Sequence, residues 1–113
     1  MKLSAQYVSA EEAADIYQVM FKKVLDSDND YLIIQRQFEF PDDGRCYFED
    51  GNDIDNTGHY YVKKALLMRN SLSIEILRKK DRNIVIEFQI PDNKFERVKQ
   101  FLQIIIPNLE IIP

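Results

Sequence analysis

The chain is poor in the residues that build most catalytic and metal sites, because it has one cysteine, one histidine and three glycines. One Cys and one His cannot form a zinc site of the usual nitrogen and sulfur type. The sequence also lacks the Gly-rich phosphate loops and the G-x-S-x-G nucleophile motif. We therefore expect a protein that is not an enzyme and that uses no cofactor and no metal.

Long apolar segments and a second cysteine are missing as well. No stretch approaches the roughly 20 apolar residues that span a membrane, and no apolar segment of a secretory signal follows the first residues. Cys46 has no second cysteine with which to form an internal disulfide. Both absences favour the reducing cytoplasm. Three glycines and four prolines leave no room for a low-complexity linker, so we expect residues 1–113 to form a single domain.

Acidic and basic side chains are unevenly distributed along the chain, whose net charge is −4. Residues 1–58 contain 5 Lys and Arg against 13 Asp and Glu, whereas residues 59–113 contain 10 against 6. Affinity for nucleic acid depends on clustered Lys and Arg, so we do not expect this acidic protein to bind it. An acidic surface suits a basic protein partner, although it also serves plain solubility.

Two patterns in the first 25 residues predict a strand followed by a helix. Residues 2–8 alternate between apolar and polar, which is typical of a strand. Ser9 and Glu12 then have the spacing of a capping box, which satisfies backbone N–H groups at the start of a helix. We expect an amphipathic helix from Ala10 to about Leu25. Its apolar stripe would consist of Ala13, Ile16, Met20 and Val24.

The segment after this helix resembles half of a calcium loop but lacks its two most demanding positions. Residues 26–30 have the D-x-D-x-D spacing of such a loop. The sixth position is Tyr31 where Gly is needed, and the twelfth is Gln37 where a bidentate Glu is needed. We therefore interpret residues 26–30 as a solvated turn.

The strongest strand pattern covers residues 31–40. Arg36 falls on the apolar face of this strand, and a buried guanidinium needs a carboxylate or several carbonyl partners. We expect Arg36 to pair inside the domain rather than to lie at the edge of the sheet. The apolar side chains of this face are Leu32, Ile34, Phe38 and Phe40.

Further strands and a second helix follow. Strands at residues 72–76 and 84–90 would form a hairpin, and a helix would begin near Asp92 or Asn93 and end at Pro107. Before them the pattern predicts a turn at 41–44, a strand at 45–50, a polar loop at 51–58, and a strand at 59–69 with a bulge at Lys63 and Lys64.

These elements define an α+β fold class. We expect a mainly antiparallel sheet of about five to six strands, packed in two layers with two amphipathic helices. The short turns between consecutive strands argue against parallel strand–helix–strand units, which need long crossovers.

Two catalytic arrangements stay open at the level of sequence. Cys46 and His59 lie on different predicted strands, where a nucleophile and its base could in principle meet. A magnesium site made of carboxylates alone could come from Glu49, Asp50, Asp53 and Asp55. Such sites normally hold a phosphorylated substrate too, and no segment is built to cradle phosphate. A small metal-dependent enzyme is therefore kept as an alternative.

The segment from residue 49 to residue 61 is the most unusual part of the chain, because it combines carboxylates with aromatic side chains. Acidic side chains steer a basic partner, and aromatic side chains supply the anchors of protein interfaces. The alternative is a solvated loop that leads into a strand whose tyrosines simply pack. The predicted partner-binding residues are Glu49, Asp50, Asp53, Asp55, Asn56, His59, Tyr60 and Tyr61.

Several short motifs in the middle of the chain occur in a familiar order. They are Tyr31-Leu-Ile-Ile-Gln-Arg36, Cys46-Tyr-Phe-Glu49, Gly58-His-Tyr-Tyr61 and the strand Leu66–Ile76. In motif order and length the chain resembles the immunity protein 10 family of bacterial polymorphic toxin systems, over about residues 31–106. The Gly-Gly pair of the family's Gly/Tyr segment is absent, since this chain has His59-Tyr60-Tyr61 there.

The resemblance implies a non-catalytic cytoplasmic protein that binds a co-encoded toxin, as in toxin–antitoxin pairs, and neutralises it. Binding would occlude the active site or an exosite of the toxin. An acidic face would suit a basic toxin such as a nuclease, which needs Lys and Arg to hold phosphate. The alternative binding role is that of a chaperone for a secreted effector, which would also be small and acidic.

Overall fold

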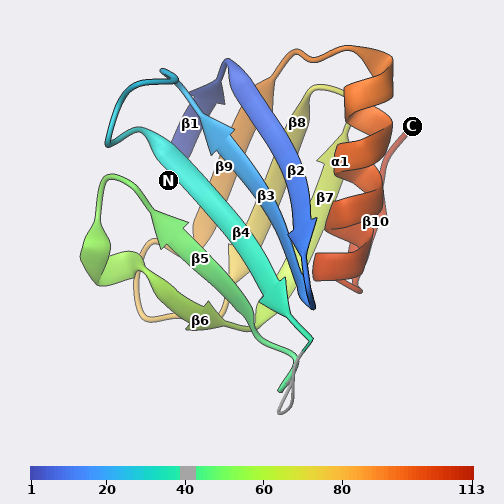
Figure 1. Ribbon diagram of the computed structural model, residues 1–113. Helices are drawn as coiled ribbons and strands as arrows, with labels where there is room; N and C mark the ends of the chain where they lie inside the picture. The colour runs from blue at the N-terminus through green and yellow to red at the C-terminus, as the bar shows by residue number, and fades with distance from the viewer. Residues whose placement is uncertain (39–42) are drawn as a thin grey trace.

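The protein folds into two five-stranded sheets and one α-helix over residues 1–38 and 43–113, which the computed structural model describes. One sheet lies in front of the other in Figure 1, and we call them the front sheet and the back sheet. The front sheet contains β2 (Tyr7–Ala13), β3 (Ile16–Lys22), β4 (Tyr31–Gln37), β5 (Cys46–Asp50) and β6 (Gly58–Tyr60). The back sheet contains β1 (Lys2–Ala5), β7 (Val62–Met68), β8 (Ser71–Ile76), β9 (Asn83–Phe88) and β10 (Leu109–Ile111).

The front sheet is an antiparallel meander in the order β2-β3-β4-β5-β6. At its centre Ile34 lies opposite Val19 on β3 and Phe48 on β5, and all three side chains are fully buried. Since side chains alternate along a strand, Tyr31 and Ile33 point to the other face of the sheet. That outer face carries the candidate site described below.

The back sheet has an antiparallel centre and parallel edges. Strands β7, β8 and β9 form consecutive hairpins, whereas β1 pairs in parallel with β9 and β10 pairs in parallel with β7. Parallel pairing requires long connections, so neither edge strand could be inferred from a local hairpin pattern.

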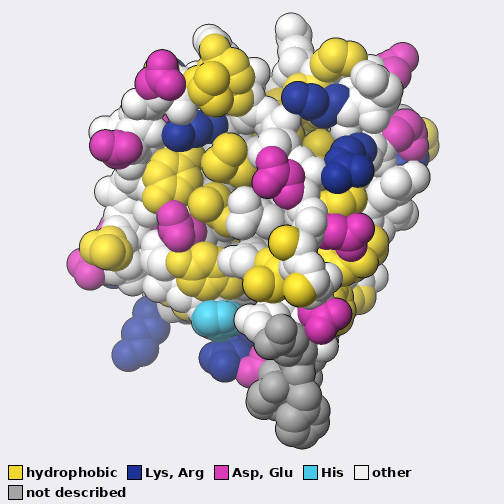
Figure 2. All heavy atoms as spheres, viewed as in Figure 1, with side chains coloured by type: hydrophobic (Ala, Val, Ile, Leu, Met, Phe, Trp, Pro, Cys, Tyr) yellow, Lys and Arg dark blue, Asp and Glu magenta, His cyan; other side chains and the backbone are white. Residues whose placement is uncertain are grey.

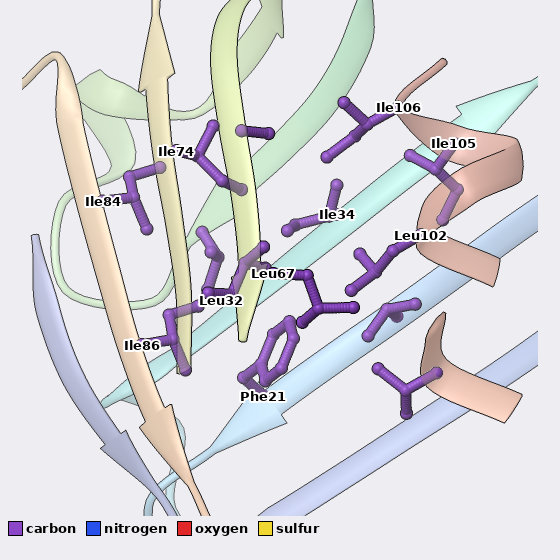
Figure 3. Packing of buried hydrophobic residues seen from close by; sticks show 14 of the residues in the cluster. Phe21, Leu32, Ile34, Leu67, Ile74, Ile84, Ile86, Leu102, Ile105 and Ile106 are labelled. Carbon is purple, nitrogen blue, oxygen red and sulfur yellow. The ribbon is translucent and has the colours of Figure 1, made fainter. Parts of the chain in front are cut away.

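One hydrophobic core joins the two sheets to the helix α1 (Asp92–Ile105). The ring of Phe21 on the front sheet lies 5.9 Å, between centroids, from that of Phe88 on the back sheet. Full burial of one large apolar side chain stabilises a fold by about 1.5–3 kcal/mol, so the sheets depend on each other. Figure 3 shows other members of this core, namely Leu32, Ile34, Leu67, Ile74, Ile84, Ile86, Leu102, Ile105 and Ile106.

The predicted helix from residue 10 to residue 25 is wrong, because these residues contribute to the hairpin of β2 and β3 and the connection that follows it. Val19 and Phe21 are fully buried, and Tyr17 packs against the same core. Their spacing has the period of a strand. Burial of such side chains outweighs helix propensities, which differ among ordinary residues by less than about 1 kcal/mol each.

The turn between β2 and β3 explains why this hairpin was missed. Ala13 pairs with Ile16, which leaves Ala14 and Asp15 as the two turn residues, and Ala14 has a φ of 54°. Two-residue hairpin turns usually contain Gly, Asn or Asp at positions of positive φ. Because alanine is not typical of such a position, the turn was not recognised. The capping-box pattern of Ser9 and Glu12 led instead to the prediction of a helix.

The α+β class and the mostly antiparallel pairing are confirmed, but the number of elements is not. The described residues form ten strands and one helix, where about five to six strands and two helices were expected, and the two-layer arrangement is not confirmed. The predicted second helix is α1, which begins after Pro91 and ends before Pro107. In the described part of the chain, no helix is both long and apolar enough to cross a membrane.

Several local predictions can be compared with the structure. The hairpin of residues 72–76 and 84–90 is confirmed as β8 and β9, and the predicted bulge is confirmed by a register shift between Val62 and Lys64. The strand expected at residues 2–8 is divided between β1 and β2, and Tyr7 is exposed rather than buried with Leu3.

The strand predicted at residues 31–40 is confirmed as far as Gln37. Phe38 was expected in the core, but its side chain is partly exposed. Phe40 and part of the predicted turn at 41–44 lie outside the described residues. Arg36 does find a carbonyl partner inside the fold, because its Nη1 donates a hydrogen bond to Ile105 O at 3.3 Å.

Candidate partner-binding surface

The eight predicted residues fall into groups with different environments. Glu49 and His59 lie on the outer face of the front sheet, and Asp53 and Asp55 lie in the loop between β5 and β6. Tyr61 lies beyond β6, at the end of the sheet away from that loop. The remaining three, which are buried or partly buried, are Asp50, Asn56 and Tyr60.

Glu49 is the centre of a hydrogen-bonded cluster on the outer face. Its two carboxylate oxygens accept hydrogen bonds from two tyrosine hydroxyls, Tyr31 at 2.5 Å and Tyr47 at 2.9 Å. The hydrogen bond to Glu49 raises the pKa of Tyr31 to about 12, with partial burial contributing in the same direction. Partial burial, followed by the bond to Glu49, raises the pKa of Tyr47. Both tyrosines therefore stay neutral near neutral pH, with their rings held against the carboxylate.

Neighbouring side chains extend this cluster, so that the group covers four strands, β3 to β6. The ring of His59 on β6 lies 5.2 Å from that of Tyr47, to which it is paired in register. On the other side, Ile33 of β4 lies between Glu49 and Met20 of β3. This part of the outer face thus combines half-buried aromatic and aliphatic side chains with a carboxylate. Such a composition is typical of protein interfaces, where aromatic residues are enriched.

Asp50 and Asn56 are buried, and their role in the structure is to shape the loop between them. Asp50 Oδ1 accepts a hydrogen bond from Asn52 N at 2.9 Å, and Asp50 N donates to Thr57 Oγ1 at 3.0 Å. Asn56 Nδ2 donates to Asp53 Oδ2 at 3.1 Å and to Asp81 Oδ2 at 2.8 Å. The second bond connects the front sheet's loop to the turn between β8 and β9. These two residues position the surface rather than form it.

Tyr60 and Tyr61 lie in different environments. Tyr60 packs against Phe48, with 6.4 Å between ring centroids, and the guanidinium of Arg78 lies 5.3 Å from its ring centroid. The hydroxyl of the half-exposed Tyr61 donates to Asp43 O at 3.2 Å. Tyr60 therefore contributes to packing, as in the alternative stated for this segment, and Tyr61 does not adjoin Glu49.

The loop between β5 and β6 presents an apolar side chain that the sequence reasoning missed. Residues Ile54–Asn56 form a single turn of 3-10 helix, η1, whose N-cap Asp53 accepts a hydrogen bond from Asp55 N at 3.0 Å. Ile54 is 83% exposed, the highest value among the large hydrophobic residues. It stands between two carboxylates at the end of the front sheet.

The two catalytic arrangements that the sequence left undecided can be compared with the structure. Cys46 is buried in the core, where its thiol donates to Ile105 O at 3.2 Å, whereas His59 is exposed on the outer face. A Cys–His pair is therefore not formed. Among the described residues no three His, Cys, Asp or Glu side chains are grouped so that they could hold a metal ion.

Charge is separated between the two sheets. Residues 6–60, which contain the front sheet, have 4 Lys and Arg against 13 Asp and Glu, a net charge of −9. The rest of the chain, which contains the back sheet and α1, has 11 against 6, a net charge of +5. Figure 2 shows the face of the front sheet, where acidic side chains and some Lys and Arg side chains are scattered among apolar ones. The aromatic cluster of Tyr31, Tyr47 and His59 thus lies in the acidic half of the chain.

Tyr31 and Tyr47 are the site residues that sequence reasoning missed. Tyr47 could have been found, because it lies two residues before Glu49 on one strand and so shares its face. Tyr31 could not, because its position depends on the pairing of β4 with β5. Comparison of the chain with protein-family models, with curated proteins and with solved structures found no match.

Proposed function

We propose that this chain is a non-catalytic binding protein that neutralises a cognate bacterial toxin by direct contact. It would act as an immunity protein and would use the outer face of the front sheet. The proposal rests on the motif resemblance to the immunity protein 10 family and on the character of this face. The single observation that carries it is the charge separation, which leaves the aromatic cluster inside an acidic half.

Electrostatics is the first support for a basic partner. A net charge of −9 on the stretch that forms the front sheet would attract a positively charged protein and orient it toward that sheet. The net charge of +5 elsewhere would turn the back sheet away from the same partner. Steering of this kind raises association rates and weakens as salt is added.

The aromatic cluster is the second support, since steering alone does not hold a complex. Tyr31, Tyr47 and His59 offer rigid rings, and the two tyrosines are already oriented by Glu49. Side chains that are ordered before binding lose less entropy when the complex forms. Each oxygen of Glu49 accepts one tyrosine, so its remaining lone pairs are available to an arginine or lysine of the partner.

The mechanism would be occlusion. A basic toxin that acts on nucleic acid needs its Lys and Arg side chains to hold phosphate, and contact with the acidic face would cover them. No bond is made or broken by this chain in such a mechanism. Neutralisation then depends on the affinity and lifetime of the complex alone.

The proposal is tested by co-expression with the product of the neighbouring gene in the cells that encode this chain. Growth arrest by that product, relieved by this chain, and a purified complex of equal stoichiometry would support it. A neighbouring product that is harmless, or that does not bind, would contradict it.

A charge-reversal pair tests the steering step. We expect Asp53→Lys and Asp55→Lys to slow association with the purified neighbouring product and to flatten its salt dependence. Asp55→Lys is the cleaner of the two, because the Asp53 side chain also holds the loop. The matched control is Glu110→Lys, which makes the same change on the back sheet. Equal association rates for Asp55→Lys and Glu110→Lys would show that this loop does not face the partner.

A further inference from the structure

Two loops at one end of the front sheet expose aliphatic side chains beside the aromatic cluster. The loop between β3 and β4 exposes Val24 by 51% and Leu25 by 54%, and the loop between β5 and β6 exposes Ile54 by 83%. Figure 1 shows both loops on the left of the molecule, at the same end of the sheet. We call residues 23–30 and 51–57 together the loop tip.

The two loops are joined to each other by a pair of reciprocal hydrogen bonds. Asp30 N donates to Asn52 Oδ1 at 2.9 Å, and Asn52 Nδ2 donates to Asp30 Oδ1 at 3.0 Å. The Tyr31 ring lies directly against Gly51, in the space that a Cβ would occupy. The tip is therefore coupled to the Tyr31 and Glu49 cluster, and the two loops are coupled to each other.

Internal hydrogen bonds also order each loop. In the first, Lys23 N donates to Asp30 O at 3.0 Å and Lys22 Nζ donates to Leu25 O at 2.9 Å. In the second, Asp53 accepts bonds from Asp55 N and from the Asn56 side chain. Exposed aliphatic groups on an ordered backbone can be buried by a partner without a large entropic cost.

The loop tip is acidic. Its two loops contain five aspartates and one lysine, Lys23. Exposed aliphatic side chains with aspartates close to them in sequence match the anatomy of an interface with an apolar centre and a charged rim. The complementary surface is a concave one with an apolar floor and a rim of Lys and Arg.

We propose that the loop tip is the anchor of the complex, and that Ile54 and Leu25 enter a basic cleft of the partner protein. This rests on the proposed function, in which the partner is a basic toxin, and it names the part of the surface that enters it. The aspartates of the tip contact the lysines and arginines at the rim of the cleft. The outer face around Glu49 then lies against the surface next to the cleft.

The test uses single substitutions of equal chemistry on the tip and away from it. Ile54→Ser and Leu25→Ser each remove an exposed aliphatic side chain from the tip. Ile104→Ser is the matched control, because Ile104 is 40% exposed and lies on α1, which Figure 1 shows on the side of the molecule opposite the two loops. All three should fold with unchanged melting temperature, since none removes a buried group.

The measurement is the Kd for the purified neighbouring-gene product, made without its toxic activity, by calorimetry. We expect Ile54→Ser and Leu25→Ser each to raise the Kd at least about tenfold, and Ile104→Ser to leave it unchanged. Hydrogen exchange in the wild-type complex should slow at amides of residues 23–30 and 51–57.

The outcomes separate this inference from the function on which it rests. Wild-type affinity in both tip variants, together with weakened binding by Tyr47→Ala or His59→Ala, would overturn the anchor and leave the binding function intact. Failure of the wild-type chain to bind the neighbouring product would overturn both. Loss of affinity in Ile104→Ser equal to that of the tip variants would overturn the anchor as well.

Discussion

The central strands of the two sheets have similar inner faces and different outer faces. Strand β4 of the front sheet buries Leu32 and Ile34, and strand β8 of the back sheet buries Leu72, Ile74 and Ile76. On the outside, β4 presents Tyr31, Ile33 and Gln35, whereas β8 presents Ser71, Ser73 and Glu75. Inner faces must fill one common core, so they converge on the same residue types. Outer faces are free of that demand, and the large aromatic and aliphatic groups on one of them are the basis of the proposed partner-binding role.

The largest expected effect on stability concerns the hydrophobic core that the two sheets share. Phe21→Ala and Phe88→Ala should each lower the free energy of unfolding by about 3–5 kcal/mol, because each leaves a cavity between the sheets. The double variant should lose less than the sum, since the two rings lie 5.9 Å apart between centroids. Chemical denaturation monitored by circular dichroism measures this. Two separate transitions would contradict a shared core, and Met68→Ala, at an exposed position, is the control.

A smaller effect is expected where the sheets are joined by a polar contact. Asn56→Ala should lower the free energy of unfolding by about 1–3 kcal/mol, because a buried amide that bonds two carboxylates is lost. The bond from Asn56 is the main cause of the lowered pKa of Asp81, so that pKa should rise in the variant. A carboxyl titration by NMR would detect the change. An unaltered Asp81 titration would mean that the Asn56 contact is absent in solution.

Gly51→Ala should damage the front sheet's site and spare the back sheet. Its new Cβ would occupy the place of the Tyr31 ring, and overpacking of this kind costs about 1–3 kcal/mol. The displaced Tyr31 would lose its bond to Glu49, so its pKa should fall from about 12 toward the ordinary value of 10.0. Ultraviolet titration of tyrosinate reports this. Gly44, whose φ is 84°, is an unsuitable control because any side chain there is strained.

The smallest expected effect is a pH dependence of stability that arises from Tyr31 on the front sheet. The folded state raises the pKa of Tyr31 from 10.0 to about 12, so the stability contributed by this group is present below pH 10.0 and is lost as the pH rises toward 12. In Glu49→Gln the main cause of the shift is weakened, and this loss should shrink. Melting temperatures of both proteins across that pH range are the measurement. Parallel curves would indicate that Glu49 does not hold Tyr31.

The parts of the fold that could be predicted are those whose signals are local. Alternating side chains and a short connection are sufficient to identify the hairpin of β8 and β9, and helical spacing with flanking prolines identifies α1. The hairpin of β2 and β3 was missed because Ala14 adopts a positive φ without Gly or Asn. The edge strands β1 and β10 pair with partners distant in sequence, and no local pattern contains that information.

The candidate site was predictable only in part, for similar reasons. Composition drew attention to residues 49–61, and Glu49 and His59 do lie together with aromatic side chains. In the sequence, Asp50 and Asn56 are polar residues like their neighbours. In the structure they are buried. Ile54 was passed over because an aliphatic residue is expected inside, and only the folded loop shows that it projects.

By itself the sequence determined the α+β class, the antiparallel character and the imbalance of charge, because these follow from composition and from contacts between near neighbours. Tertiary structure alone decided that the acidic residues 6–60 form one sheet, so that an imbalance along the chain becomes a difference in charge between the segments that build the two sheets. It also brought Tyr31 to Glu49 and the two loops of the tip to one end. The physical reason is that strand pairing joins residues distant in sequence, and their register is set by the burial of the opposite face.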